Sequence, residues 1–159
     1  MSARIGLGFD IHKLVPGQGF RLGGVEIPSE FATEGHSDAD CLLHALVDAL
    51  LGAASRGDIG EHFPDTDSRW KGADSRVFVE KARGMVDEAD LTIGNVDATV
   101  FLEEPKLGGL KKQMEQAIAE MLKINVASVS VKAKTLEGLG TIGTSQAVAA
   151  HVGVVLHQR

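Results

Sequence analysis

Three side chains in the first third of the sequence are of the kinds that bind zinc. Asp10 and His12 are separated by one residue in a segment that alternates in polarity, so in a strand both would point the same way. His44 lies in a leucine- and alanine-rich segment typical of a buried helix. Two imidazoles and a carboxylate leave zinc an open fourth position, which is a catalytic pattern. Taken separately, a D-x-H tripeptide can arise by chance, and a helix histidine is commonly an ordinary hydrogen-bonded core residue.

Two aspartates flank His44 at helical spacing. Asp40 and Asp48 lie four residues before and after it, so the three polar side chains would form one stripe along an apolar helix. Carboxylates beside a metal-ligating imidazole commonly orient its ring. We therefore predict that Asp40 and Asp48 orient His44, and that replacing Asp48 with alanine weakens zinc binding roughly 10- to 100-fold.

The segment that opens the same helix, EGHSDAD over residues 34–40, has two interpretations. Ser37 or Asp38 could simply cap the free backbone amides of the first turn. Alternatively, the helix start could receive a phosphate group, with His36 as an additional donor.

Two later segments are also candidates for ligand binding. In GDIGEHFPDTD, residues 57–67, the carboxylates of Asp58, Asp65 and Asp67 could accept hydrogen bonds from ligand hydroxyls, or the segment could be an ordinary turn. In KAKTLE, residues 132–137 at the end of a predicted strand, Thr135 could donate to a phosphate and Glu137 could hold a magnesium ion.

The elements that must position these residues are mixed along the chain. Apolar periodicity predicts strands over 5–12, 20–27, 95–102 and 129–135, and helices over about 38–55, 75–89 and 110–122. For the apolar segment 146–156, periodicity alone does not decide between strand and helix, and we expect a strand. Strand 5–12 would be half-buried, with Ile5, Leu7, Phe9 and Ile11 on one face and Gly6, Gly8, Asp10 and His12 on the other. It would form a long hairpin with strand 20–27, and Ser75 would cap the second helix. This order predicts one α+β domain over residues 1–159, with a mixed sheet packed against helices.

Composition narrows the function classes. The chain has 159 residues and a formal charge of -6, with six Phe, one Trp and no Tyr, which disfavours nucleic acid as a partner. The most apolar stretch, 41–55, carries His44 and Asp48, so no membrane span is predicted. A single cysteine and a start without a targeting segment favour a soluble cytoplasmic protein. An anionic ligand would therefore need metal ions and backbone amides to attract it.

Five ordered blocks, GFDIH, GHSDADCLLHALVDALLGAA, GDIGEHFPDTD, EEPKL and KAKTLEGLG, resemble the 2-C-methyl-D-erythritol 2,4-cyclodiphosphate synthase family. The resemblance extends from about Arg4 to Leu156. It implies a homotrimer of α+β subunits with active sites between neighbouring subunits. It also implies cyclisation of 4-diphosphocytidyl-2-C-methyl-D-erythritol 2-phosphate with release of CMP, in non-mevalonate isoprenoid synthesis. The alternatives are a metal-dependent phosphohydrolase and a non-catalytic module that binds cytidine nucleotides or isoprenoid diphosphates.

The resemblance also implies roles for particular residues. Zinc ligands fall on Asp10, His12 and His44, and Glu137 falls on a magnesium or manganese contact. His36 and Thr135 match the residues that support the phosphates during the reaction. The implied substrate contacts are Asp10, His12, His36, Ser37, Asp58, Ile59, Gly60, Phe63, Pro64, Asp65, Thr66, Asp67, Leu102, Pro105, Lys106, Leu107, Gly108, Lys134, Thr135, Leu136, Glu137, Thr141 and Thr144. Among these, the loop from Leu102 to Gly108 would form a cytosine pocket donated by the adjacent subunit.

Two positions depart from the family pattern. The turn TIGTSQA, residues 141–147, has Thr144 and Gln146 in a region where many members carry an arginine. We therefore do not expect this chain to make the contact of that arginine, whether the contact is with substrate or with an isoprenoid diphosphate in the central cavity of the trimer. Lys134 replaces a frequent threonine and adds a cation beside the phosphate site.

Overall fold

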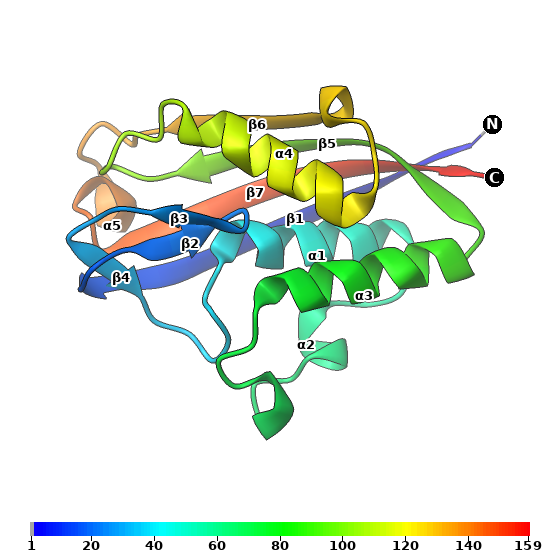
Figure 1. Cartoon of the computed structure of the whole chain (residues 1–159), viewed down its shortest axis with the longest axis horizontal. Coiled ribbons are helices and arrows are strands. Elements are labelled where there is room, and N and C mark those ends of the chain that lie inside the picture. The colour runs from blue at the N-terminus through cyan, green and yellow to red at the C-terminus, as the bar shows by residue number, and fades with distance from the viewer. Residues whose placement is uncertain (1) are drawn as a thin grey trace.

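A twisted five-stranded sheet carries its three long helices on one face (Figure 1). The computed structural model describes residues 2–159. The strand order is β4-β1-β7-β5-β6, and all neighbours are antiparallel except β5 and β6. A separate two-stranded sheet is formed by β2 and β3. The strands are β1 Ala3–Pro16, β2 Phe20–Leu22, β3 Val25–Ile27, β4 Phe31–Thr33, β5 Leu91–Phe101, β6 Val129–Lys134 and β7 Ala147–Gln158.

The three long helices cover different parts of the sheet. Helix α1 packs on β1 and β7, α3 lies against α1, and α4 lies against β6. The bounds are α1 Cys41–Ala53, α2 Ile59–His62, α3 Ser75–Glu88, α4 Leu110–Leu122 and α5 Gly140–Gly143, with 3₁₀ turns η1 Ser68–Trp70 and η2 Val126–Ser128. The predicted α+β arrangement, including a strand for the chain end, is confirmed. The loop predicted over 57–67 contains the one-turn helix α2, and the turn predicted over 139–145 contains α5.

Two glycines let α1 lie directly on the backbone of β1. A Cβ atom at Gly6 would stand 1.9 Å from the carbonyl oxygen of Ala49, and one at Gly8 would stand 1.9 Å from that of Ala45. Such a separation is far inside van der Waals contact, so only glycine permits this approach. Because Asp10 and His12 share this face of β1, the same packing brings them toward the helix that carries His44.

The apolar face of β1 is exposed in the subunit. Ile5, Leu7, Phe9 and Ile11 are 72%, 66%, 57% and 46% exposed, respectively. The alternation and the half-buried character predicted for this strand are confirmed, and its buried side is the one that carries Gly6 and Gly8. The core lies on the glycine face, where α1 contributes ten buried residues.

The predicted hairpin between strands 5–12 and 20–27 is also wrong. β1 pairs with β4 and β7, whereas β2 and β3 pair with each other, Phe20 opposite Ile27. Gly23 and Gly24 both have positive φ and form the turn between these two short strands.

Asp40 joins this turn to α1. Its carboxylate accepts hydrogen bonds from the backbone nitrogens of Gly23 (2.9 Å), Gly24 (2.8 Å) and Leu43 (3.0 Å), and it is fully buried. Burial raises the pKa of Asp40, and these three backbone donors oppose the effect. Asp40, rather than Ser37 or Asp38, is therefore the N-cap of α1. Similarly, Asp74 rather than Ser75 caps α3.

Replacing Asp40 with alanine is expected to lower the free energy of unfolding by about 3 kcal/mol, because it removes a helix cap and leaves two turn amides unpaired. Asp74→Ala is the matched control, since Asp74 caps α3 at the surface through one bond to Arg76 N. We expect that variant to lose only about 1 kcal/mol. Urea titration measures both values, and equal losses would contradict the anchoring role of Asp40.

Within residues 2–159, the helices are too short or too polar to cross a bilayer.

Candidate active site

β1 and α1 bring Asp10, His12 and His44 together. His12 Nε2 lies 2.8 Å from Asp10 Oδ2, and His44 Nδ1 lies 3.2 Å from both atoms. Three corners of a tetrahedron with metal–ligand bonds of about 2.0 Å are about 3.3 Å apart, so these separations fit a bound zinc. In the part of the chain that the structure describes, this is the group of side chains with metal-binding geometry. The three-ligand set predicted from spacing is confirmed as a possible metal site.

The outer nitrogens of both imidazoles have partners. His12 Nδ1 donates to the carbonyl oxygen of Glu34 at 2.9 Å, so Nε2, which lies toward the triad, is the nitrogen that would give up its proton and offer a lone pair to a metal. His44 Nε2 lies 2.8 Å from Ser75 Oγ and 3.0 Å from Ser37 Oγ.

The predicted orienting role of Asp40 and Asp48 is wrong. Asp40 caps α1, and Asp48 Oδ1 accepts a hydrogen bond from Ile59 N at 2.7 Å, which ties α2 to α1. The His44 ring is instead contacted by two serines. The expectation that Asp48→Ala weakens zinc binding therefore loses its structural basis.

The ionisation of the Asp10 carboxylate suits the binding of a cation. Burial alone would raise the pKa of Asp10, but hydrogen bonds from His12 and His44, together with their charges, lower it to about 2. Burial would lower the pKa of His12, but the hydrogen bond and charge of Asp10 raise it. The carboxylate of Asp10 is thus ionised at neutral pH, as a metal ligand must be.

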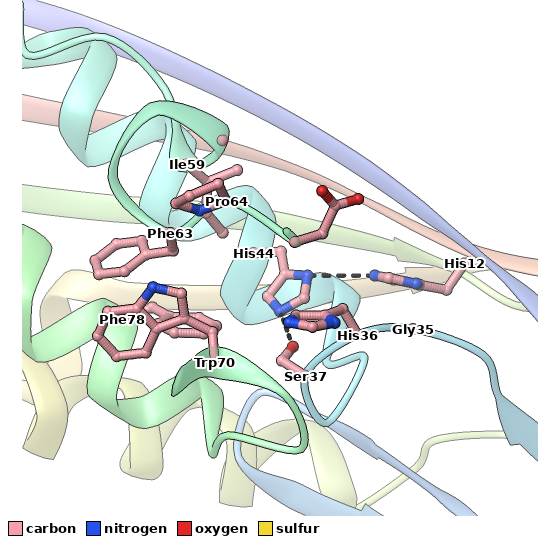
Figure 2. Close-up of a pocket in the computed structure, with 12 residues that line it drawn as sticks. His12, Gly35, His36, Ser37, His44, Ile59, Phe63, Pro64, Trp70 and Phe78 are labelled. Atoms are coloured by element: carbon pink, nitrogen blue, oxygen red, sulfur yellow. Dashed lines mark hydrogen bonds between the residues drawn. The ribbon is translucent and has the colours of Figure 1, made fainter. Parts of the chain in front are cut away.

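The two histidines of the triad line a cavity of about 460 Å³ (Figure 2). Its lining consists of His12, Gly35, His36, Ser37, His44, Ile59, Gly60, Phe63, Pro64, Asp65, Trp70 and Phe78. Figure 2 shows the histidines and Ser37 on one side and the aromatic rings on the other. The rings of Phe63 and Phe78 stack with centroids 4.6 Å apart, and Trp70 meets both edge-on. The cavity therefore joins a polar, metal-binding side to an apolar side.

Other residues predicted from the 57–67 loop have local partners. Asp58 caps α2 through Glu61 N, and Asp67 forms an ion pair with Arg69 at 2.6 Å. The hydrogen bonds from Arg69 lower the pKa of Asp67. Of the three carboxylates predicted to accept ligand hydroxyls, Asp65 lines the cavity.

A second cavity of about 210 Å³ lies where β5 and β6 end. It is lined by Leu102, Glu103, Pro105, Lys106, Leu107, Gly108, Lys111, Ala133, Lys134 and Thr135. Glu103 accepts hydrogen bonds from Leu136 N and Gly138 N, both at 3.1 Å, and so holds the turn that carries Glu137. The predicted phosphate residues are thus divided within one subunit: His36 lines the first cavity and Thr135 the second. Glu137 is not part of the Asp10, His12 and His44 group.

The unusual C-terminal turn borders another cavity of about 410 Å³, lined by Ile11, Lys13, Leu14, Thr141, Gln146 and Ala147. Thr144 Oγ1 donates to the carbonyl oxygen of Gly140 at 2.9 Å and accepts from Gln146 at 3.0 Å. Its hydroxyl is therefore occupied within the turn.

Sequence reasoning did not assign Trp70, Phe78 or Ser75 to the site. Phe78 has the helical spacing of a core residue, and that spacing does not separate a core from a cavity wall. Ser75 had a recognisable signal: Asp74 and Ser75 are adjacent candidate caps, and only one of them can occupy the N-cap position.

An α+β subunit with an Asp, His, His centre open to a cavity is typical of a metal-dependent enzyme. The chain belongs to the YgbB family, whose model matches residues 3–157. It is 48% identical over 155 residues to 2-C-methyl-D-erythritol 2,4-cyclodiphosphate synthase of Solibacter usitatus, covering 98% of each chain. It is 50% identical to the synthase of Syntrophomonas wolfei, covering 98% of this chain and 99% of the relative. The CDP complex of IspF from Plasmodium falciparum aligns with a TM-score of 0.87 and 35% identity, covering 99% of this chain and 97% of that one.

Proposed function

We propose that this protein converts 4-diphosphocytidyl-2-C-methyl-D-erythritol 2-phosphate into 2-C-methyl-D-erythritol 2,4-cyclodiphosphate and CMP, as a cytoplasmic phosphorus–oxygen lyase of isoprenoid synthesis. The observation that carries the proposal is the triad, whose ligand atoms lie 2.8–3.2 Å apart at the edge of a cavity. Full-length identity of about half to the named synthases supports the same reaction.

The chemistry requires positioning more than proton abstraction. A phosphate monoester has a second pKa near ~6, so the attacking 2-phosphate is already ionised at neutral pH. It attacks the β-phosphorus, a new P–O bond forms, and the bond to CMP breaks. This accounts for a site with hydrogen-bond donors and metal ligands but without an evident nucleophile and base pair.

The chain's own residues would hold the phosphates. His36 and Ser37 would donate from the first cavity, and Thr135 with Lys134 would donate from the second. Asp10, His12 and His44 would hold zinc, and Glu137 would contact magnesium or manganese. When bound, these ions supply positive charge that neutralises and aligns the diphosphate.

A homotrimer would complete the site. His36 and Thr135 line different cavities, and in the view of Figure 1 the β5–α4 connection and α2 lie on opposite sides of the β2–β3 hairpin. A neighbour's second cavity would therefore face the first cavity of each subunit and receive the cytosine. The exposed apolar face of β1 supports assembly, because four consecutive outward side chains of this size are rarely left in water. The interior of the trimer could hold an isoprenoid diphosphate, next to a turn that has Thr144 in place of the usual arginine.

Phosphorus NMR of the substrate with protein, zinc and magnesium tests the proposal. We expect CMP and a cyclic diphosphate to appear together and in equal amounts. Inorganic phosphate in place of the ring would indicate the phosphohydrolase. An intact substrate with fully metal-loaded protein would indicate the non-catalytic binding module.

A further inference from the structure

His44 lies between two carboxylates that compete for the position of its ring proton. On one side, Nδ1 is 3.2 Å from Asp10 Oδ2. On the other side, Nε2 is 2.8 Å from the hydroxyl of Ser75, and that hydroxyl donates a hydrogen bond to Asp38 Oδ1. A neutral imidazole carries one proton, so the two sides favour opposite tautomers.

Only one tautomer is ready to bind a metal. If the proton is on Nδ1, it donates to Asp10 and occupies the position of a ligand lone pair, so a metal must displace it. If the proton is on Nε2, the Nδ1 lone pair points toward the triad. The tautomer of His44 therefore affects the affinity of the site for a cation.

The Asp38–Ser75 pair favours the second tautomer. An ionised carboxylate only accepts hydrogen bonds, so the Ser75 proton is committed to Asp38 and its oxygen presents lone pairs to His44 Nε2. Asp38 is itself fixed, since Oδ2 accepts from Ser75 N at 2.9 Å and Oδ1 accepts from Asp40 N at 3.2 Å. Ser75 is fully buried. Water therefore does not reach the Ser75 hydroxyl that links Asp38 to His44.

The geometry points to Asp38 and Ser75 as positioning residues that hold His44 in its metal-ready tautomer. They act through His44, because Ser75 and Asp38 do not line the cavity, whereas Ser37 does. Ser37 Oγ also contacts Nε2, at 3.0 Å. Because the ring proton can satisfy both serine oxygens, the Ser37 hydroxyl proton remains free to point into the cavity. The corresponding tautomer of His12 is favoured directly by the backbone, since the Glu34 carbonyl oxygen accepts its Nδ1 proton.

The inference rests on the metal centre of the proposed function, and zinc affinity tests it without substrate. By chelator competition, we expect Ser75→Ala and Asp38→Asn each to raise the zinc dissociation constant 10- to 100-fold. In Asp38→Asn the amide can donate to Ser75, whose hydroxyl then donates to Nε2 and favours the wrong tautomer. The double variant should be little worse than either single one, because both act through the same bond. Asp48→Asn is the matched control on α1, with an expected change of less than about twofold.

A spectroscopic readout separates this role from a structural one. In the zinc-loaded parent, the Nε2 proton of His44 should give a protected imidazole NMR signal, which should shift or exchange faster in both variants. Circular dichroism checks that each variant is folded, and the near-isosteric Asp38→Asn provides the test if Ser75→Ala does not fold. Parent-like zinc affinity in folded Asp38→Asn, with an unchanged His44 signal, would overturn the inference. An inactive parent that still shows these affinity changes would refute the synthase reaction alone.

Discussion

His44→Ala is expected to abolish stoichiometric zinc binding and to lower turnover by at least about 10³-fold. The charge that a metal contributes at a transferring phosphate is worth several kcal/mol, and each ~1.4 kcal/mol corresponds to a tenfold change in rate. The metal-free fold should persist, with an unfolding free energy within about 1 kcal/mol of the parent, because the core does not depend on the metal site. Metal analysis after dialysis and the NMR assay measure the two effects.

His157→Ala is the control for this variant. His157 lies near the end of β7, opposite Ala3 and Thr92, and outside the cavity that holds the triad. Its zinc content and turnover should match the parent. Equal zinc content in His44→Ala and parent would contradict the assignment of His44 as a ligand.

Leu7→Glu is expected to convert the proposed trimer into monomers and to remove most of the turnover. The side chain is 66% exposed in the subunit, so the subunit itself should tolerate the charge. In the assembly, an unpaired buried carboxylate costs about 3–5 kcal/mol per subunit, which is roughly a 10²- to 4 × 10³-fold loss of association. Activity falls with the assembly because each site would lose the cavity donated by its neighbour. Light scattering after size-exclusion chromatography measures the mass.

The control is Val126→Glu, the same kind of change at an exposed apolar residue of η2. We expect this variant to remain a fully active trimer. A parent protein that is monomeric, or an active monomeric Leu7→Glu variant, would contradict a site shared between subunits.

The sequence determined the candidate metal ligand set and the alternation of β1. Asp10 and His12 share a face because side chains in a strand alternate strictly, and this period needs no tertiary information. His44 was identifiable as a polar residue in a helix that is otherwise almost entirely apolar. The mixed order of strands and helices followed from apolar periodicity, and the five ordered blocks indicated the family.

The tertiary structure decided which face is covered and which partners meet. Periodicity shows that Ile5 and Leu7 share a face, but not that α1 packs on the glycine face opposite them. The helix spacing of Asp40 and Asp48 suggested that they contact His44, but Asp40 is held by a turn 16 residues away and His44 by a serine 31 residues away. Hydrogen-bond partners of buried groups depend on long-range packing, because each group must be satisfied by whatever the fold brings beside it. For the same reason, only the folded subunit separates His36 from Thr135 into two cavities.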